Sequence, residues 1–187
     1  MDGKITLVIG GARSGKSTYA ENLAKNSFKS VAYIATAIPF DSGLRDRIRK
    51  HQESRPKDWT TIEQYDDLYN IMPKLAIDHE VIILDCVTIM ITNLMFKELE
   101  TDWESLDYGE IDKIEEDIRN QFHNLVKSIR DQNLWFICVT NEIGMGIVPD
   151  NKLSSIFRDI AGRINQYLAK EADEVILTVS GIPMKIK

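Results

Sequence analysis

Residues 10–18 read GGARSGKST, and they stand between the apolar run Ile5–Ile9 and the helix-like segment TYAENLAKN. The stretch fits the pattern G-x-x-x-x-G-K-[ST]. Its defined positions hold Gly10, Gly15, Lys16 and Ser17. In this pattern, a strand, loop and helix present backbone N–H groups and the positive end of a helix dipole to an anion, and the lysine adds a mobile charge. We therefore predict a phosphate-binding loop; the alternative is a glycine-rich turn that only tightens a strand-to-helix connection.

Short apolar runs recur along the chain, with helical segments between them. These runs are Ile5–Ile9, Val31–Ala35, Val81–Leu84, Leu134–Val139 and Val175–Val179. Such alternation is typical of parallel strands joined by right-handed crossovers. The ending predicts a further, antiparallel edge strand over Met184–Lys187, after a tight turn at Ser180-Gly181-Ile182-Pro183. The pattern thus predicts an α/β fold with a mainly parallel sheet and an antiparallel C-terminal edge strand.

Two helical stripes of apolar residues predict core-facing helices rather than binding surfaces. One comprises Ile111, Ile114, Ile118, Phe122, Leu125, Val126 and Ile129; the other comprises Leu153, Ile156, Phe157, Ile160, Ile164 and Leu168. A chain of 187 residues lies within the size range of one domain. We expect residues 1–187 to form a single nucleotide-binding domain.

The charge of the chain limits its partners. The formal net charge is −6 at pH 7, and the sequence pI is about 5.1. Nucleic-acid binding depends largely on neutralising phosphates with a basic surface, so this balance argues against a nucleic-acid partner. A nucleotide needs only the amides of the loop and one lysine.

Other features of the composition predict an ordinary globular protein of the cytoplasm. No long apolar segment precedes the loop, and no run approaches the roughly 20 apolar residues of a membrane span. We expect neither a signal peptide nor a membrane span. The two cysteines, Cys86 and Cys138, stand at or next to the ends of apolar runs. Small buried thiols are their simplest interpretation.

A carboxylate follows the apolar strand Val81–Leu84 at Asp85. The carboxyl ends of parallel strands form the ligand-binding edge of such a sheet. An acid there, next to the phosphate loop, could hold Mg²⁺ directly or through water. The alternative is an acid that caps the following helix.

Two known uses of such a loop are disfavoured. A signalling GTPase reads guanine through an Asn-Lys-x-Asp element, whereas the strand that ends at Val139 is followed by Thr140-Asn141-Glu142-Ile143-Gly144. A motor or recombinase needs a nucleic-acid-binding surface, against which the acidic balance argues. Phosphoryl or nucleotidyl transfer to a small molecule remains. The segment VTNEIGMGIVP would lie beside the phosphate loop, either as a plain loop or as a substrate-side or subunit-contact loop.

His51 differs from His79 and His123, which stand in a polar turn and on the polar side of a helix. It lies in the basic segment RDRIRKHQESRPKDW. The cationic residues around it are Arg45, Arg47, Arg49, Lys50, Arg55 and Lys57. By composition alone, the segment could be a solvated helix face.

An ordered set of blocks resembles one enzyme family from end to end. The blocks are GGARSGKS, YIAT at Tyr33–Thr36, RI-x-x-H-x-x-x-RP-x-x-W from Arg47 to Trp59, Asp85-Cys86 with Thr92-Asn93-Leu94, VTNEIGMGIVP, FRDIAGRINQ and VSGIPMKIK. Together they are similar to the bifunctional adenosylcobinamide kinase / adenosylcobinamide-phosphate guanylyltransferase of cobalamin assembly. The loop alone is common to very many proteins, but the ordered set is specific.

This resemblance implies a P-loop NTPase fold of the RecA-like, three-layer type, and two reactions. Adenosylcobinamide, a corrinoid, is phosphorylated by ATP or GTP, and GMP from GTP is then transferred to that phosphate through a GMP–histidine intermediate. The family histidine falls on His51, and Lys16 is the second catalytic residue. The resemblance further implies a homotrimer.

The family's nucleotide contacts carry over to Gly10, Gly11, Ala12, Arg13, Ser14, Gly15, Lys16, Ser17, Ile34, Ala35, Thr36, Gln52, Glu53, Ser54, Arg55, Glu63 and Asp85. Ser17 and Asp85 would bind Mg²⁺. Some family members carry Glu at the position of Asp85, and either carboxylate can serve a metal.

Histidine chemistry agrees with the role of His51. An imidazole nitrogen attacks phosphorus only when neutral, and with an unperturbed pKa near 6.5 about three-quarters of it is neutral at pH 7. Cationic neighbours lower the pKa further, and they could stabilise charge on the α-phosphate and the departing pyrophosphate. Two alternatives stay open: a kinase for another small alcohol, in which His51 only binds phosphate, and a nucleotide-dependent switch module without a nucleophile.

Overall fold

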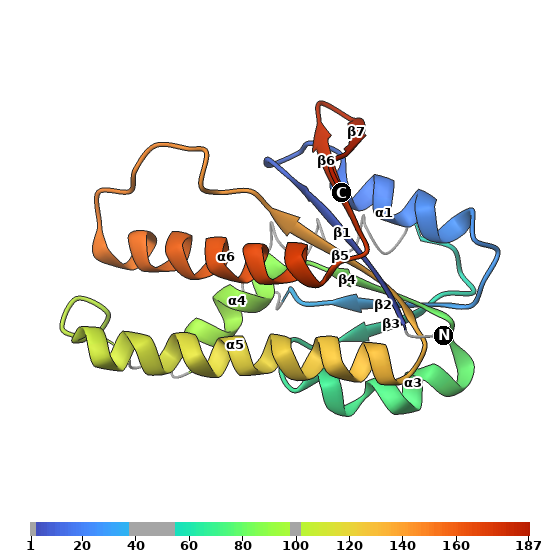
Figure 1. Ribbon diagram of the computed structural model, residues 1–187, viewed down its shortest axis with the longest axis horizontal. Helices are drawn as coiled ribbons and strands as arrows, with labels where there is room; N and C mark the ends of the chain where they lie inside the picture. Colours follow the sequence, from blue (N-terminus) through green and yellow to red (C-terminus); the bar gives the residue numbers. More distant parts are fainter. Residues whose placement is uncertain (1–2, 38–54, 98–101) are drawn as a thin grey trace.

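The structure, a computed structural model, describes residues 3–37, 55–97 and 102–187. These residues form a seven-stranded sheet in the order β3-β2-β4-β5-β1-β6-β7 (Figure 1). The strands are β1 (Lys4–Gly10), β2 (Val31–Ala35), β3 (Thr60–Glu63), β4 (Val81–Asp85), β5 (Trp135–Asn141), β6 (Glu174–Val179) and β7 (Ile182–Lys185). All neighbouring pairs are parallel except β6 and β7. The predicted mainly parallel sheet with an antiparallel C-terminal edge is confirmed.

Helices cover both faces of this sheet, which gives the three predicted layers (Figure 1). The described helices are α1 (Lys16–Lys25), the 3-10 helix η1 (Leu68–Asn70), α3 (Met72–Asp78), α4 (Val87–Met95), α5 (Tyr108–Asp131) and α6 (Lys152–Glu171). Successive strand side chains point to opposite faces. In β1, Val8 packs with Ala20 and Ala24 of α1, whereas Leu7 and Ile9 join the core under α3, α4, α5 and α6.

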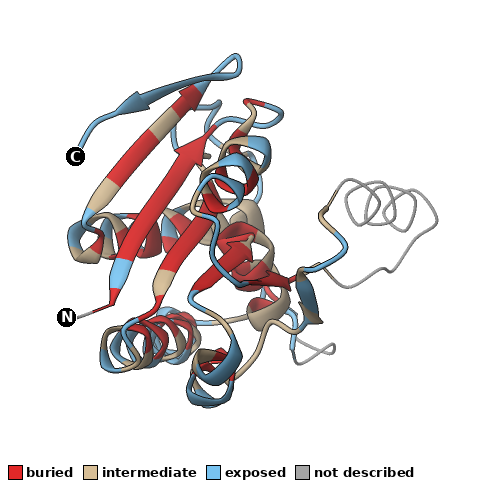
Figure 2. Ribbon diagram, turned by 90° about the vertical axis from the view of Figure 1, so that its right-hand side faces the viewer, coloured by how far each residue is buried: buried red, intermediate tan, exposed pale blue. Residues whose placement is uncertain are grey.

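The central strands are buried along most of their length, whereas β7 is exposed (Figure 2). The two predicted apolar stripes lie on α5 and α6 and pack into the larger core, as expected. α5 begins with a capping box, in which Asp107 and Glu110 each accept a backbone N–H of the other. None of the helices in the described ranges has the length and apolar character that a membrane crossing requires.

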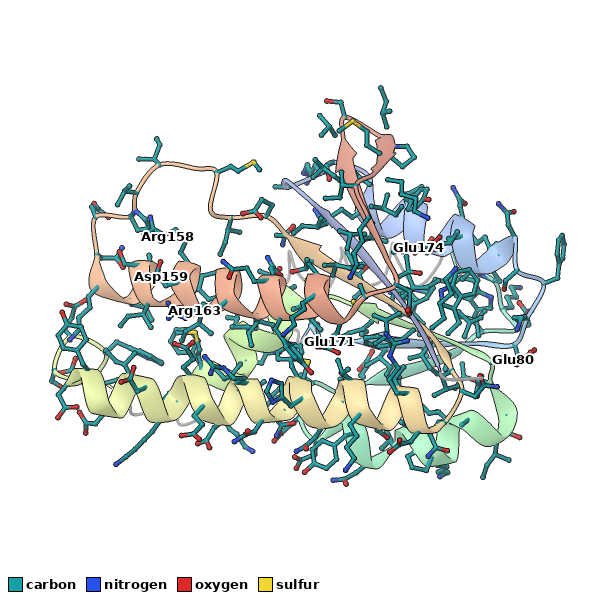
Figure 3. All side chains as sticks on the ribbon, in the orientation of Figure 1. Glu80, Arg158, Asp159, Arg163, Glu171 and Glu174 are labelled. Atoms are coloured by element: carbon teal, nitrogen blue, oxygen red, sulfur yellow. The ribbon has the colours of Figure 1, made fainter. Side chains whose placement is uncertain are left out.

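An ion pair fastens α5 to α6. Arg163 of α6, which Figure 3 labels between the two helices, donates from Nε and Nη2 to the two carboxylate oxygens of Glu115, at 2.6 Å each. The Glu115 hydrogen bond raises the pKa of the Arg163 guanidinium, although burial opposes the shift. Glu115 is 8% exposed, and this two-point contact, together with Arg119 Nη2 at 3.1 Å from Oε1, satisfies the buried acid.

Two details of the predicted strands are wrong. β3 was not predicted, because its sequence TTIE has one apolar side chain and is mostly exposed; it is a strand only because it pairs with β2. The final turn is shorter than predicted. Ser180 and Gly181, with φ values of 52° and 82°, form the turn, while Ile182 and Pro183 already belong to β7. An edge strand tolerates this proline because one side of its backbone needs no ladder partner.

The topology brings the carboxyl ends of β1, β2, β4 and β5 to one edge of the sheet. Gly10 at the end of β1 is in register with Asn141 of β5, and Asp85 of β4 pairs with Val139 of β5 on one side and Ala35 of β2 on the other. β5 thus lies between β4, which carries Asp85, and β1, which leads into the phosphate loop. The expectation that Asp85 lies directly next to the loop is therefore wrong by one strand. The first residue after β5 lies beside the start of the loop, where Glu142 N donates to the Gly10 carbonyl oxygen at 3.0 Å.

Candidate nucleotide site

The predicted phosphate loop joins β1 to α1 at this carboxyl edge. Arg13 and Gly15 have positive φ values of 55° and 94°, so the loop turns sharply before the helix. Gly15 is the N-cap residue of α1, and no side chain caps the helix or adds an acid to its first turn. The first amides of α1 are therefore left for an anion, which the helix dipole also favours.

Lys16 lies folded over this loop. Its Nζ donates to the carbonyl oxygen of Gly11 at 2.6 Å, and the residue is 7% exposed. Burial lowers the pKa of the Lys16 ammonium, and the negative charge of the nearby Asp85 opposes that shift. Asp85 is thus within electrostatic reach of the loop lysine across β5. A bound phosphate would give the ammonium a stronger partner than the Gly11 carbonyl.

The turn between β6 and β7 supports the loop from the far end of the chain. Gly181 N donates to the Ser14 carbonyl oxygen at 2.9 Å, and the hydroxyls of Ser14 and Thr178 are 2.8 Å apart. A Cβ built on Gly15 would stand 3.1 Å from Gly181 Cα. A Cβ on Gly10 would stand 2.4 Å from the Thr178 carbonyl oxygen. Close packing against β6 therefore requires glycine at position 10, and at position 15 the positive φ favours glycine beside the tight approach to the turn.

Asp85 is bound to β2 rather than acting as a helix cap. Its Oδ2 accepts a hydrogen bond from the hydroxyl of Tyr33 at 2.6 Å. The residue that caps α4 is Cys86, whose Sγ accepts from Ile89 N at 3.5 Å. The helix-cap alternative for Asp85 is therefore wrong.

Arg55 lies against the other side of the same tyrosine. Its guanidinium carbon is 3.4 Å from the centroid of the Tyr33 ring, and Trp59 stacks beside that ring at 6.4 Å between centroids. Lys25 of α1 lies over Trp59 in turn, with Nζ 5.9 Å from the centroid. The RP-x-x-W part of the basic segment is thus packed against β2 and α1, at the edge where Asp85 stands.

The predicted contacts Ile34, Ala35 and Thr36 end β2 at this edge. Thr36 Oγ1 donates to the Cys86 carbonyl oxygen and accepts from Cys86 N, both at 2.9 Å, which ties β2 to the start of α4. Glu63 ends β3 directly opposite Ala35. Thr36 and Glu63 both line a crevice of about 340 Å³. We refer to Tyr33, Thr36, Arg55 and Asp85 as the β2–β4 edge.

Several predicted residues lie outside the described ranges. His51, Gln52, Glu53 and Ser54 are among them, so the structure gives no geometry for the predicted nucleophile. The described residues hold no cluster of three or more His, Cys, Asp or Glu side chains suited to a metal ion. Mg²⁺ needs none, because it commonly takes one or two protein oxygens and fills its shell with water and phosphate oxygens. The oxygens of Ser17 and Asp85 are of that kind.

The cysteines agree with their simple interpretation. Cys86 and Cys138 are both free and buried. Burial raises the pKa of each thiol to about 12, and Asp85 adds to the shift at Cys86. Both remain neutral thiols near pH 7, and a neutral thiol is a poor nucleophile.

The structure also brings to the site residues that sequence analysis did not select. Tyr33 stands inside the block YIAT, but a tyrosine in an apolar strand is typical of core. Thr178 was predicted only as part of the strand Val175–Val179. A threonine inside that apolar run indicates a polar contact. A third group fixes the end of β5: the Thr140 hydroxyl donates to Asn165 Oδ1 at 2.7 Å, and Thr88 Oγ1 accepts from Asn141 N at 2.8 Å.

Comparison with known proteins gives matches over almost the whole chain. A family model described as "Cobinamide kinase / cobinamide phosphate guanyltransferase" matches residues 6–186. "Bifunctional adenosylcobalamin biosynthesis protein CobU" of Escherichia coli (strain K12) is 43% identical over 182 residues, which are 97% of this chain and 98% of that one. The protein of the same name from Salmonella typhimurium gives the same values. "Bifunctional adenosylcobalamin biosynthesis protein CobP" of Pseudomonas aeruginosa is 36% identical over 181 residues, 97% and 96% of the two chains.

Solved structures give more distant matches. The RadB recombinase superposes with a TM-score of 0.47 at 16% identity, covering 94% of this chain and 74% of that one. A KaiC-like protein from Pyrococcus horikoshii gives a TM-score of 0.48 at 14% identity, with 94% and 72% covered. The assignment of the fold rests on the strand order and layers described above.

Proposed function

This chain belongs to the cobinamide kinase / cobinamide phosphate guanyltransferase family, and from that premise we propose that one site, built on the phosphate loop, serves both reactions. The protein is a bifunctional enzyme of adenosylcobalamin biosynthesis, as its curated relatives are named. Adenosylcobinamide is its corrinoid substrate; ATP or GTP supplies the phosphoryl group, and GTP supplies the GMP group.

In the kinase step, the loop and Lys16 hold the triphosphate. The alcohol of the substrate attacks the γ-phosphorus, the bond to the bridging oxygen breaks, and the nucleoside diphosphate leaves as the alcohol loses its proton. Charge spreads over the phosphoryl oxygens during this transfer, so positioned amides and an ammonium provide most of the catalysis. The uncapped start of α1 and the buried Lys16 supply both.

In the guanylyl step, the neutral His51 nitrogen attacks the α-phosphorus of GTP and pyrophosphate leaves. A phosphate oxygen of the phosphorylated corrinoid then attacks the same phosphorus and breaks the P–N bond. This yields adenosylcobinamide-GDP and restores the imidazole. Covalent catalysis replaces one displacement by two in-line ones. Gln52, Glu53, Ser54 and Arg55 would contact the nucleotide next to the nucleophile.

The observation that carries this proposal is the position of Arg55. It is packed on Tyr33, whose hydroxyl binds Asp85, and Asp85 acts electrostatically on Lys16 of the loop. Only four peptide steps separate residue 55 from residue 51, a span of at most about 14 Å for the covalent chain. A histidine attached there is tethered within that span of the β2–β4 edge. This supports a nucleophilic role for His51 over a solvated helix face.

Magnesium fits the oxygen ligands of the same region. We propose that the Ser17 hydroxyl and the Asp85 carboxylate bind Mg²⁺ together with phosphate oxygens of the nucleotide. Bound Mg²⁺ neutralises charge that develops on the phosphates. Asp85 holds one oxygen toward Tyr33, and its other oxygen is the one available for the ion or a water on it.

Trapping of the covalent intermediate tests the proposal directly. The protein is incubated with Mg²⁺ and GTP labelled at the α-phosphate, then denatured and analysed for label on the chain. We expect label that acid removes and alkali does not, as for a phosphoramidate. GTP labelled at the γ-phosphate should leave none. Absence of α-label would overturn the histidine relay, and a kinase for another alcohol or a switch module would carry none.

Three coarser features complete the proposal. We propose a homotrimer, for which light scattering should give about three times the chain mass of 21.4 kDa. We propose that residues 1–187 form one domain, which predicts a single cooperative unfolding transition. We propose a cytoplasmic location, where both nucleotides are available, and cell fractionation would test it.

A further inference from the structure

One buried side chain connects the two charged groups of the β2–β4 edge. Tyr33 is 1% exposed, although it carries a polar hydroxyl. That hydroxyl donates to Asp85 Oδ2 at 2.6 Å, and the ring supports the guanidinium of Arg55 at 3.4 Å. Asp85 is the proposed metal-side acid, and Arg55 follows the proposed nucleophile along the chain. Tyr33 therefore sets the separation of these two groups.

The hydroxyl of Tyr33 is the donor in its contact with Asp85. A carboxylate only accepts hydrogen bonds, and the phenol oxygen lies 2.6 Å from Asp85 Oδ2. Asp85 therefore keeps one oxygen engaged, which restricts the rotation of the carboxylate and orients its other oxygen.

The cation on the ring is fixed but not fully bonded. Among the described residues, Nε and Nη1 of Arg55 are buried and have no hydrogen-bond partner. A buried guanidinium nitrogen without a partner is costly, so such donors indicate a site for an anion. The contact with the ring holds the guanidinium without using its N–H groups. The ring thus presents the donors of Arg55 instead of satisfying them.

We propose that Tyr33 is a positioning residue of this enzyme: its hydroxyl orients Asp85 for the metal and its ring holds Arg55 for the phosphates of the nucleotide. This inference rests on the proposed function, because it uses the roles given there to Asp85 and Arg55. The hydroxyl and the ring of Tyr33 thus have different roles. Loss of the hydroxyl affects both reactions through Asp85, whereas loss of the ring adds a defect through Arg55 in guanylyl transfer.

The variant Tyr33→Phe isolates the hydroxyl. Kinase activity and GTP-dependent self-labelling are measured separately, each over a range of Mg²⁺ concentrations. We expect kcat to fall about 10- to 100-fold in both reactions, as when a partner of a metal ligand is removed. The half-saturating Mg²⁺ concentration should rise, and the KM for the nucleotide should change little. Wild-type kcat and Mg²⁺ dependence in this variant would overturn the proposal.

The variant Tyr33→Leu removes the ring as well. Relative to Tyr33→Phe, self-labelling should fall further while kinase activity stays at the same level. Arg55→Leu in the wild-type background should reproduce that selective loss without a change in Mg²⁺ dependence. An equal further loss in both reactions would overturn the role of the ring. If Tyr33→Leu does not fold, Tyr33→Phe still tests the role of the hydroxyl, and Arg55→Leu still tests the role of the ring.

A matched control separates positioning from general destabilisation. Tyr167→Phe removes a hydroxyl from α6, where the tyrosine packs on His123 at 4.3 Å between ring centroids on the opposite side of the sheet. It should leave kcat and Mg²⁺ dependence unchanged. The wild-type enzyme separates the two proposals: if it takes no α-label, the proposed histidine relay fails, whereas normal labelling in both wild type and Tyr33→Phe overturns only the role of Tyr33.

Discussion

The phosphate loop and the β2–β4 edge serve one proposed nucleotide, but they are held in place by different groups. Backbone atoms take part in most contacts of the loop: Gly181 N donates to the Ser14 carbonyl, Lys16 Nζ donates to the Gly11 carbonyl, and Gly10 packs closely against β6. Side chains hold the edge, where Tyr33 contacts Asp85 through its hydroxyl and Arg55 through its ring. The loop should therefore be sensitive to added atoms as well as to lost side chains, and the edge mainly to lost side chains.

The difference also divides the chemistry. The loop grips phosphates that are present in both reactions, because ATP and GTP carry the same triphosphate. The edge joins the metal-side acid to the segment of the nucleophile, which only guanylyl transfer uses. Substitutions in the loop should lower the rates of both reactions together. Substitutions of Arg55 or His51 should lower the rate of guanylyl transfer and leave the kinase rate largely unchanged.

The largest separation is expected for His51→Ala. Loss of a nucleophile costs on the order of 10⁴- to 10⁶-fold, so guanylyl transfer and α-labelling should vanish while kinase activity is retained. His123→Ala is the matched control, since His123 packs on Tyr167 away from the site and should leave the label in place. Guanylyl transfer retained at the wild-type level by His51→Ala would contradict the relay.

Lys16→Ala should remove the common element instead. Deleting one positioned donor to a developing oxyanion costs about 10²- to 10³-fold, and we expect losses of this size in both reactions. The measurement is kcat/KM for each half-reaction, with circular dichroism to confirm folding. If only one reaction suffered, the two triphosphates would occupy different sites, and the comparison between loop and edge would no longer hold.

Gly10→Ala tests whether backbone packing sets the loop. The added Cβ would stand 2.4 Å from the Thr178 carbonyl oxygen and 2.7 Å from Ser14 Oγ, so the loop or β6 must move. Overpacking of this kind costs about 1–3 kcal/mol, and a displacement near 1 Å can cost about 10²-fold in rate. The midpoint of urea unfolding and both activities should fall together.

The control for that glycine lies within α6. A Cβ at Gly162 meets no atom within 4 Å outside its own helix, and alanine is the better helix former. Gly162→Ala should stabilise the protein by about 0.5–1 kcal/mol and leave both activities unchanged. Equal destabilisation by the two substitutions would show that the close approach at Gly10 is not what matters.

The contrast between a local motif and contacts of distant side chains also explains how much of this fold and site the sequence alone could predict. The strands of the sheet interior were predicted to within about two residues, because a strand buried on both faces is a continuous apolar run. The phosphate loop was also predictable, since its motif is local. β3 was not, because Thr60 and Thr61 are exposed and only pairing with β2 makes them a strand.

The missing parts of the candidate site are contacts between distant residues. Tyr33 and Asp85 are 52 positions apart, and Ser14 and Thr178 are 164 apart. No periodicity or spacing in the chain encodes which strand ends become neighbours; the strand order does. The resemblance included Tyr33 in the block YIAT but gave only Ile34–Thr36 as nucleotide contacts, because the role of a tyrosine in an apolar strand depends on which group its hydroxyl contacts.

Thr178→Val is the mildest substitution at the loop and tests its long-range support. Valine keeps the shape of threonine but removes Oγ1, so the buried Ser14 hydroxyl, which is 2.8 Å from it, loses its partner. An unsatisfied buried hydroxyl costs about 1–3 kcal/mol. We expect the urea midpoint to fall without a change in m-value, and both activities to decrease by the same factor.

Thr178→Ser is the informative companion, because it keeps the hydroxyl and loses only a methyl group. It should retain the activities of wild type more fully than Thr178→Val does. If valine lowered stability but left both activities unchanged, β6 would support the fold without shaping the loop. If valine impaired guanylyl transfer alone, the loop would not be common to the two reactions. The distinction between a shared loop and a β2–β4 edge that separates the reactions would then be wrong.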